Sequence, residues 1–346
     1  MSRILITGGA GFIGSNLADR LAGEGCAVTV LDTLARPGVE TNLKWLLRRH
    51  GETVRHVAAD VRDATAMARA VEDADAVFHL AAQVAVTTSL ADPRTDFEVN
   101  VIGAINVLEA ARRGRTPVIF ASTNKVYGDL ADIDLSAEEG AWLPRDAALR
   151  RTGVDEHRPL DFHTPYGCSK GAADQYVLDY ARSFDLPTCV LRMSCIYGPR
   201  QMGTEDQGWV AHFLIQALEG QAIILYGDGR QVRDVLHVSD AVDAYVAAWR
   251  RMAAVRGRAF NLGGGPDNAV SLRLLIGHIE RLVGGRVSLA FEDWRAGDQR
   301  YFVADSSAAR RALGLNGPVS WREGVAELAD WLRSERRLGA RVGTAA

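Results

Sequence analysis

The sequence predicts an α/β fold: a doubly wound parallel sheet with a smaller C-terminal α/β lobe. Through residues 1–192, short and almost continuously apolar runs alternate with helical periods. This is the pattern of parallel strands that helices cover on both faces. After Arg192 the alternation loosens. The 346 residues are enough for one large domain or two ordinary ones.

The first part of the chain contains the clearest alternation. We expect strands at Ile4–Thr7, Ala27–Asp32, Val54–Ala58, Ala76–Leu80, Val118–Ala121 and Thr188–Arg192. The clearest helical periods are Gly11–Leu21, Arg94–Arg113 and Tyr166–Phe184. Strands that alternate with helices in this way form βαβ units, so residues 1–192 are expected to form one domain.

The second part is expected to form a lobe over residues 193–334, from which the chain can cross back to the sheet. We expect helices at Trp209–Glu219, Ser239–Met252 and Leu272–Val283, and strands at Ala222–Tyr226, Ala259–Leu262 and near Val287–Phe291. The last helix starts at Ser320, which forms a capping-box pattern with Glu323. Residues 335–346 are expected to fray.

Composition excludes several classes of protein. With 43 acidic and 40 basic residues, the net charge of −3 argues against binding to nucleic acid or anionic membranes by bulk charge. The longest uncharged stretch, Ala76–Ala91, is too short and too polar to span a membrane. The chain begins Met-Ser-Arg-Ile-Leu-Ile without a charged-then-apolar leader, so we expect a cytoplasmic protein. Its four cysteines form no C-x-x-C pair, so we expect free thiols and no metal.

Three glycines mark the turn after the first strand. Gly8, Gly11 and Gly14 have the spacing G-x-x-G-x-x-G, with Phe12 and Ile13 between the last two. Such a turn lets backbone N–H groups at a helix N-terminus approach a pyrophosphate, although an ordinary tight turn also fits. Asp32 ends the second strand, where a carboxylate binds ribose hydroxyls and repels a 2′-phosphate. Together they predict a Rossmann-type domain that binds NAD.

A second motif carries chemistry. Tyr166 and Lys170 are four residues apart, on one face of a predicted helix. A tyrosine with a pKa near 10 is a poor base at neutral pH. A nearby ammonium and a positively charged nicotinamide favour the phenolate, so we expect them to lower that pKa. The segment Ser122–Gly128 follows the fifth strand and emerges at the sheet edge where ligands bind.

The glycine spacing resembles the extended, sugar-nucleotide branch of the short-chain dehydrogenases/reductases. This resemblance implies that Thr123 orients the substrate oxygen, Tyr166 is the base and Lys170 is its electrostatic partner. It also implies the remaining NAD contacts: Asp60 and Val61 at the adenine, Leu80, Ala81 and Ala82 in the loop beneath the cofactor, Asn100 as a structural asparagine, and Ser122 and Ser194.

The residues after Thr123 narrow the reaction. In the family, sugar-nucleotide 4,6-dehydratases carry Asp-Glu there, and decarboxylating relatives carry a glutamate in this segment. This chain has Asn124 and Lys125 instead. Without those acids, reversible hydride transfer remains. It oxidises an alcohol to a ketone and returns the hydride to the other face, which is an epimerisation.

Several segments resemble the CDP-paratose (CDP-tyvelose) 2-epimerases of this family: Leu160–Tyr176, Asp206–Val210, Gln231–His237 and Asp298–Arg300. The resemblance implies a CDP-sugar inverted at carbon 2. Arg233 and Arg295 resemble the arginines that hold the pyrophosphate, although solvated surface arginines remain the alternative. The predicted substrate contacts are Asn124, Lys125, Arg200, Gln207, Arg233, Arg295 and Asp298.

Other functions remain open at this point. The chain could invert another carbon, for example as a 4-epimerase of a UDP- or dTDP-sugar, or act as a dehydratase or net oxidoreductase. A catalytically silent NAD-binding sensor belongs to a different class, and it would not need the intact tyrosine and lysine. By resemblance, helices Arg94–Arg113 and Tyr166–Phe184 pair two chains, so we expect a homodimer or homotetramer.

Overall fold

A parallel sheet of seven strands forms the centre of the computed structural model, which describes residues 1–295 and 297–335. In spatial order the strands are β12 (Arg258–Leu262), β8 (Thr188–Met193), β5 (Val118–Thr123), β4 (Ala76–His79), β1 (Arg3–Thr7), β2 (Ala27–Leu31) and β3 (Val54–Val57). Every neighbouring pair runs parallel. The predicted α/β class with a doubly wound parallel sheet is confirmed.

Helices cover both faces of this sheet, which explains why its strands read as continuous apolar runs. One face packs against α1 (Phe12–Gly23), α2 (Val39–His50), α10 (Val238–Arg250) and α13 (Ser307–Leu313). The other packs against α3 (Ala64–Glu72), α6 (Gly103–Gly114) and α8 (Thr164–Ser183). All six residues of β5 are buried between the two layers.

The helix predicted at Arg94–Arg113 is divided into three parts. Helix α5 (Pro93–Phe97) leads into a π-helical turn, η2 (Glu98–Ile102), and then into α6. Such turns are rare in proteins, and many of those that occur lie at functional sites. Helix α4 (Val86–Ala91) precedes this run, and α4, α5 and η2 all contact α8.

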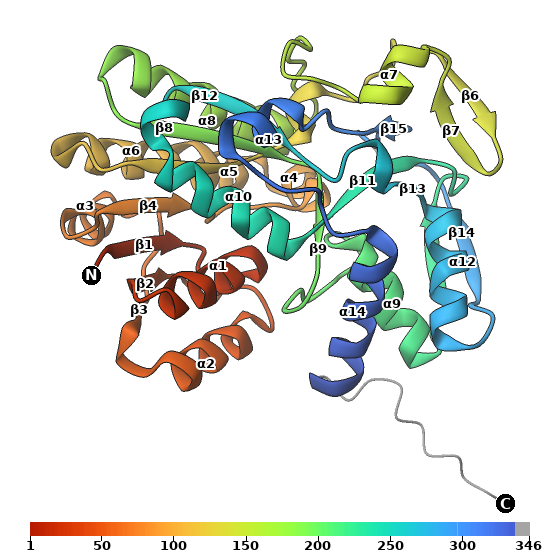
Figure 1. Ribbon diagram of the computed structural model, residues 1–346, viewed down its shortest axis with the longest axis horizontal. Helices are drawn as coiled ribbons and strands as arrows, with labels where there is room; N and C mark the ends of the chain where they lie inside the picture. The colour runs from red at the N-terminus through yellow and green to blue at the C-terminus, as the bar shows by residue number, and fades with distance from the viewer. Residues whose placement is uncertain (296, 336–346) are drawn as a thin grey trace, which may run out of the picture.

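The smaller lobe has a core of its own. It contains β9 (Cys195–Tyr197), α9 (Trp209–Glu219), β10 (Ile223–Tyr226), β11 (Val232–His237), β13 (Ala269–Ser271), α12 (Leu272–Val283), β14 (Leu289–Glu292), β15 (Tyr301–Phe302) and α14 (Trp321–Glu335). Figure 1 shows α9, α12 and α14 gathered on one side of the molecule, away from β1–β3. A hairpin of β6 (Leu135–Glu138) and β7 (Ala141–Pro144), followed by α7 (Ala147–Thr152), projects at one corner (Figure 1).

Short elements complete the chain: η1 (Gly51–Thr53), η3 (Asn124–Tyr127), α11 (Met252–Val255) and η4 (Pro266–Asn268). The predicted strand Ala259–Leu262 corresponds to β12, which pairs with β8 in the central sheet although it follows residue 192. The division into residues 1–192 and 193–334 stays a prediction. Of the predicted frayed tail, residues 336–346 lie outside the described residues. No helix in the described part of the chain is long and apolar enough to cross a membrane.

Candidate active site

The predicted site residues lie mainly at the carboxyl ends of β1, β2, β4 and β5, where open α/β sheets bind ligands. The turn after β1, which contains Gly8, Gly11 and Gly14 and is called the glycine loop below, forms one side of this site. Gly8 has a φ of +69°, and a Cβ there would lie 2.7 Å from the Ala81 nitrogen. A Cβ on Gly14 would lie 2.3 Å from the Gly8 oxygen. Both positions therefore require glycine.

The same loop opens helix α1. Gly11 is the N-cap of this helix and provides no side-chain cap, so the first N–H groups of α1 have no side chain bonded to them there. Phe12 and Ile13 form its first turn. A bare backbone at a helix N-terminus fits a pyrophosphate. Gly9 is a further packed position, because its Cβ would meet the Ile6 oxygen at 2.9 Å.

Asp32 and the Asp60–Val61 pair lie beside this loop. The Asp32 carboxylate accepts from the Ala10 nitrogen at 3.1 Å, which links the end of β2 to the glycine turn. Asp60 is held by the Arg62 side chain at 2.7 Å. Asn106 of α6, which the sequence analysis did not identify, donates to the Val61 oxygen at 2.9 Å and fixes this loop.

The loop after β4 is tied to helix α8 by Asn100. The Leu80 nitrogen donates to the Thr7 oxygen at 3.1 Å, and the chain continues through Ala81 and Ala82. Asn100, placed by the π-helical turn, accepts from the Gln83 nitrogen at 2.9 Å. Its amide also donates to the Ser169 hydroxyl of α8 at 3.0 Å.

The fold brings Thr123, Tyr166 and Lys170 together. Thr123 ends β5, whereas Tyr166 and Lys170 lie one turn apart on α8. All three are buried. The Thr123 hydroxyl acts on the Tyr166 phenol and lowers the pKa of Tyr166. The Lys170 Nζ donates to the Ala121 oxygen at 2.6 Å and lies 4.2 Å from the centre of the Phe120 ring.

Burial dominates the charges of this pair. It raises the pKa of Tyr166 to about 12 and lowers the pKa of Lys170 to about 7. In the protein by itself, desolvation of the phenolate outweighs the effect of Thr123, and the expectation that Lys170 and a bound nicotinamide together lower the pKa of Tyr166 stays a prediction.

Two predicted cofactor residues point into the protein. The Ser122 hydroxyl donates to Asp174 at 2.7 Å, since it alternates with Thr123 along β5 and faces the other way. The Ser194 hydroxyl donates to the Asp234 oxygen at 2.9 Å. Their contacts with NAD stay predictions.

Predicted substrate residues from both lobes meet next to Thr123. Asn124 donates to Gln299 at 3.3 Å, and the Lys125 Nζ donates to the Gly297 oxygen at 3.0 Å. Arg233 and Asp298 form an ion pair of 2.7 Å. Burial lowers the pKa of Lys125 to about 8.

Gln299 was missed as a site residue, although it lies inside the segment Asp298–Arg300. It is fully buried, and its amide donates to the Gly128 oxygen at 2.6 Å.

Arg295 and Gln207 lie at the edge of this group. Arg295 pairs with Glu205 at 2.8 Å and stacks 3.7 Å from the centre of the Tyr226 ring. Gln207 exchanges backbone hydrogen bonds with Thr204, so both residues belong to one tight loop.

Arg200 is not brought to this group by its observed contacts. Its guanidinium lies 3.7 Å from the centre of the Trp45 ring on α2 and 5.6 Å from that of Trp331 on α14. Its own backbone oxygen accepts from Asn42 at 3.2 Å. The contacts indicate that Arg200 joins α2 to α14, and its role toward substrate stays a prediction.

A buried ion pair that sequence reasoning missed lies beneath the site. Asp174, one turn after Lys170, accepts from the Arg192 guanidinium at 2.9 Å through both carboxylate oxygens. Arg192 also donates to the Tyr127 hydroxyl at 3.1 Å. The signal was present in the sequence, since Asp174 continues the helical face of Tyr166 and Lys170.

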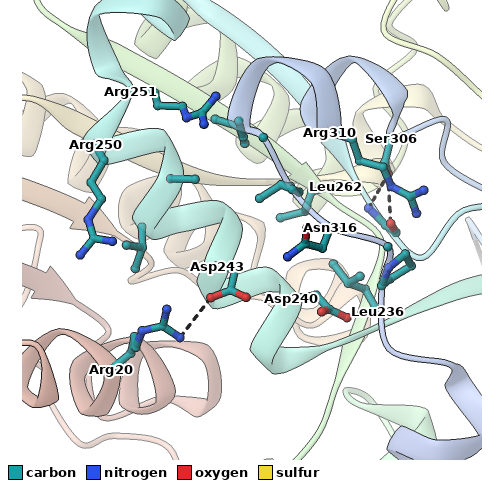
Figure 2. A pocket seen from close by; sticks show the side chains of 18 residues that line it. Arg20, Leu236, Asp240, Asp243, Arg250, Arg251, Leu262, Ser306, Arg310 and Asn316 are labelled. Carbon is teal, nitrogen blue, oxygen red and sulfur yellow. Dashed lines mark hydrogen bonds and ion pairs between the residues drawn. The ribbon is translucent and has the colours of Figure 1, made fainter.

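A cleft of about 320 Å³ opens elsewhere, between α10, the end of α13 and Arg20 of α1 (Figure 2). Arg20 and Asp243 form an ion pair of 3.1 Å within it. Another of its arginines, Arg250, pairs with Glu24 at 2.6 Å. None of the predicted site residues lines this cleft. Among the residues described, no group of three or more His, Cys, Asp or Glu side chains is placed to hold a metal ion.

Comparison with known proteins agrees with this geometry. Residues 4–263 match the model of the NAD dependent epimerase/dehydratase family. The chain is 42% identical over 341 residues to the CDP-paratose 2-epimerase of Salmonella typhi, covering 96% of this chain and 99% of that protein. It is 34% identical to the UDP-glucose 4-epimerase of Mycolicibacterium smegmatis, with coverage of 96% and 99%. The solved UDP-glucose 4-epimerase of Thermus thermophilus in complex with NAD has a TM-score of 0.79 at 31% identity, with coverage of 96% and 99%.

Proposed function

Since the chain belongs to the NAD dependent epimerase/dehydratase family, we propose that it is an NAD-dependent epimerase of a nucleoside-diphosphate sugar. Its substrate is a CDP-sugar of the paratose and tyvelose type, inverted at carbon 2. One observation carries the proposal. Thr123, Tyr166 and Lys170 lie together in the fold, and the two residues that follow Thr123, Asn124 and Lys125, supply no carboxylic acid for an elimination. The 42% identity to a CDP-paratose 2-epimerase supports the choice of sugar and carbon.

The residues around the glycine loop fit NAD. A Cβ at Gly8 or Gly14 would clash with the backbone of the tight turn, and the N-terminus of α1, which has no side-chain cap, would bind the pyrophosphate of NAD. Asp32 would bind the adenosine ribose, and Asp60 with Val61 would border the adenine. When bound, NAD would supply the acceptor and donor of the hydride at the sugar carbon, and the positive charge of its oxidised nicotinamide would favour the Tyr166 phenolate.

The chain's own residues handle the proton. Tyr166, as phenolate, removes the proton of the sugar hydroxyl while the C–H bond at the same carbon breaks, so that a C=O bond forms. Thr123 donates a hydrogen bond to that oxygen. The Lys170 ammonium, fixed by the Ala121 oxygen, stabilises the phenolate electrostatically. After the ketone has turned over, Tyr166 returns the proton to the oxygen.

Arginines of the smaller lobe would hold the diphosphate. Arg233 and Arg295 are already paired with carboxylates, those of Asp298 and Glu205. A diphosphate would compete with these carboxylates for the guanidinium groups, which releases Asp298 for a ribose hydroxyl. Lys125 adds a further cation next to Arg233.

Proton NMR of CDP-paratose, incubated in D₂O with purified protein and no added NAD, tests the reaction. We expect the carbon-2 epimer to appear with its proton retained, because the hydride leaves and returns on a cofactor that the protein holds. Tyr166→Phe should reduce turnover by at least about 10²-fold, since it removes the general base, while NAD released on denaturation stays at the wild-type amount.

The contrary outcomes separate the claims. Intact NAD without any change in CDP-paratose would remove the substrate assignment, and the assay would then move to UDP- and dTDP-sugars, on which a 4-epimerase acts. Loss of water from the sugar would indicate a dehydratase. Undiminished turnover by Tyr166→Phe would remove the base.

We further propose a homodimer in the cytoplasm. Apolar side chains on α5, η2 and α8 are exposed, together with one just after α8: Phe97, Ile102, Tyr176 and Phe184. These elements contact one another and would form one continuous surface for a second copy. Four free cysteines are consistent with a reducing compartment.

A further inference from the structure

A buried carboxylate lies beneath the catalytic helix and belongs to none of the motifs identified above. Asp96 of α5 is fully buried. Its Oδ1 accepts from the Gln83 side chain at 2.9 Å and from the Asn100 side chain at 3.1 Å. Its Oδ2 is buried without a hydrogen-bond partner in the described structure. A buried carboxylate in this condition needs a compensating cation.

Lys170 supplies that positive charge. Burial raises the pKa of Asp96, whereas the Ser169 and Gln83 side chains and the charge of Lys170 lower it. The effect is mutual, because Asp174 and Asp96 both raise the pKa of Lys170 against the larger effect of burial. Asp174 already has a cation in Arg192, whereas neither Asp96 nor Lys170 forms an ion pair within 4.0 Å with a described residue. The two are therefore opposite buried charges that act on each other through space and not through a direct contact.

The other charged or titratable groups on the elements around α8 have different partners or no charge. His79 is held neutral, because burial lowers its pKa to about 3. Arg94 and Glu98 pair with each other at the surface, at 3.1 Å. The remaining groups on these elements are Cys189 and Arg192 of β8, Glu109, Arg112 and Arg113 of α6, and Lys125 and Tyr127 of η3.

Hydrogen bonds place Asp96 rigidly relative to the catalytic pair. The Asn100 amide that donates to Asp96 also donates to the Ser169 hydroxyl at 3.0 Å. Ser169 directly precedes Lys170 and donates to the Tyr166 backbone oxygen at 3.2 Å. Asp96 is therefore fixed to the same turn of α8 that carries both catalytic side chains.

We propose that Asp96 is a positioning residue for this reaction: its carboxylate is the buried counter-ion of Lys170 and sets the proton affinity of the Tyr166 and Lys170 pair. The catalytic consequence rests on the proposed epimerase function, whereas the counter-ion role can be measured without a substrate. Asp96 acts through its charge and touches neither sugar nor NAD in this proposal.

The chain offers a direct measurement because it contains three lysines, Lys44, Lys125 and Lys170. Protein grown with ¹³Cε-labelled lysine should give three signals, and Lys44→Arg and Lys125→Arg assign them. In Asp96→Asn the pKa of Lys170 should fall by about one unit or more, because the variant keeps the shape but loses the negative charge. Lys44, exposed on α2, is the internal reference and should not move.

A matched control separates charge from structure. Gln83→Met removes one hydrogen bond to Asp96 but leaves its charge, so the pKa of Lys170 should stay near the wild-type value. A Lys170 signal that titrates alike in wild type and folded Asp96→Asn would overturn the proposal. If Asp96→Asn does not fold, the wild-type protein is measured instead. The chemical shift of Lys170 plotted against pH should then show a second inflection where Asp96 takes up its proton. A single inflection would overturn the proposal.

The activity readout then follows from the signs. Asp96 raises the pKa of both Tyr166 and Lys170. Removing its charge should lower both, so both limbs of the pH profile of kcat/KM should move toward acid in Asp96→Asn. Lost activity with unmoved limbs would mean that Asp96 is merely structural. A shifted Lys170 signal without turnover of any nucleotide sugar would remove the proposed function and leave the counter-ion role standing.

Discussion

Burial shifts the pKa values of Tyr166 and Lys170 in opposite directions, since each side chain is more stable in its neutral form away from water. The charge state of the pair therefore depends on the charges placed next to it. The positive charge of a bound nicotinamide would favour the phenolate of Tyr166, and the Asp96 carboxylate favours the ammonium of Lys170. Both effects depend on a dry site, which the buried ends of β5 and α8 provide.

His79 makes stability depend on pH at the same scale. It is fully buried against Thr7, at 2.7 Å, and its pKa is lowered to about 3. The folded state keeps this histidine neutral, whereas the unfolded state binds a proton on it below about pH 6.5. The free energy of unfolding therefore decreases as the pH is lowered. We expect a loss of about 1.6 kcal/mol in the free energy of unfolding between pH 6.5 and pH 5 from this residue.

Urea unfolding at several pH values measures this loss. His79→Gln should flatten the dependence between pH 6.5 and pH 5, even if the variant is less stable at every pH. His157 is the matched control, because its side chain is 93% exposed and its replacement by Gln should leave the dependence unchanged. An unchanged slope in His79→Gln would show that this histidine is not the group responsible.

At the scale of elements, helix α1 depends on a close approach of backbone to backbone. Gly14→Ala places a Cβ 2.3 Å from the Gly8 oxygen, so the glycine turn must open. We expect this variant to lose its bound NAD and about 1–3 kcal/mol of stability, through overpacking. Gly23→Ala, at the other end of α1, meets no atom within 4 Å and should leave both properties intact.

Thermal unfolding and the NAD released from each denatured variant check this pair. Equal NAD content in the two variants would contradict a tight turn around the pyrophosphate. Both variants replace glycine by alanine in the same helix, so a difference between them in NAD content or stability is due to the position of the new Cβ.

The π-helical turn η2 shows how an element differs from its sequence pattern. The apolar period predicted one helix through Arg94–Arg113, and the chain follows it with an extra residue in the turn at Glu98–Ile102. The turn places Asn100 between the loop after β4 and Ser169. The spacing of apolar residues did not reveal this extra residue, because apolar residues recur with the helical period of 3.6 on both sides of the turn.

At the scale of the whole molecule, the substrate side of the site belongs to both lobes. Asn124 and Lys125 come from the segment after β5, and they bond to Gln299 and Gly297, which lie 175 and 172 residues further along the chain. Strand β12 then returns the chain to the sheet beside β8. In the proposed function, sugar binding would therefore depend on the relative position of two separate clusters of buried residues.

Assembly is a second property at this scale. The double variant Phe97→Glu with Tyr176→Glu should reduce the mass in solution from a dimer to a single chain, because it puts charge on an apolar face. These two side chains are 49% and 46% exposed. Leu274→Glu is the control, since Leu274 is 47% exposed on α12 in the smaller lobe. Analytical ultracentrifugation distinguishes them, and dissociation by Leu274→Glu instead would place the interface elsewhere.

Patterns among consecutive residues were enough to predict the α/β fold, the glycine turn for NAD and the Tyr166 and Lys170 pair. Glycine spacing, apolar period and i, i+4 neighbours are local properties, so no knowledge of distant contacts was required. The family and its cofactor follow from the same motifs and are confirmed by the comparisons.

The contacts that control charge required the fold. Asp96 and Asp174 become counter-ions only when other strands and helices bury them, and Arg233 meets Asp298 across 65 residues. The raised pKa of Tyr166 likewise depends on neighbours that exclude water. Burial and long-range charge pairing arise from packing, and a residue's neighbours along the chain do not specify them.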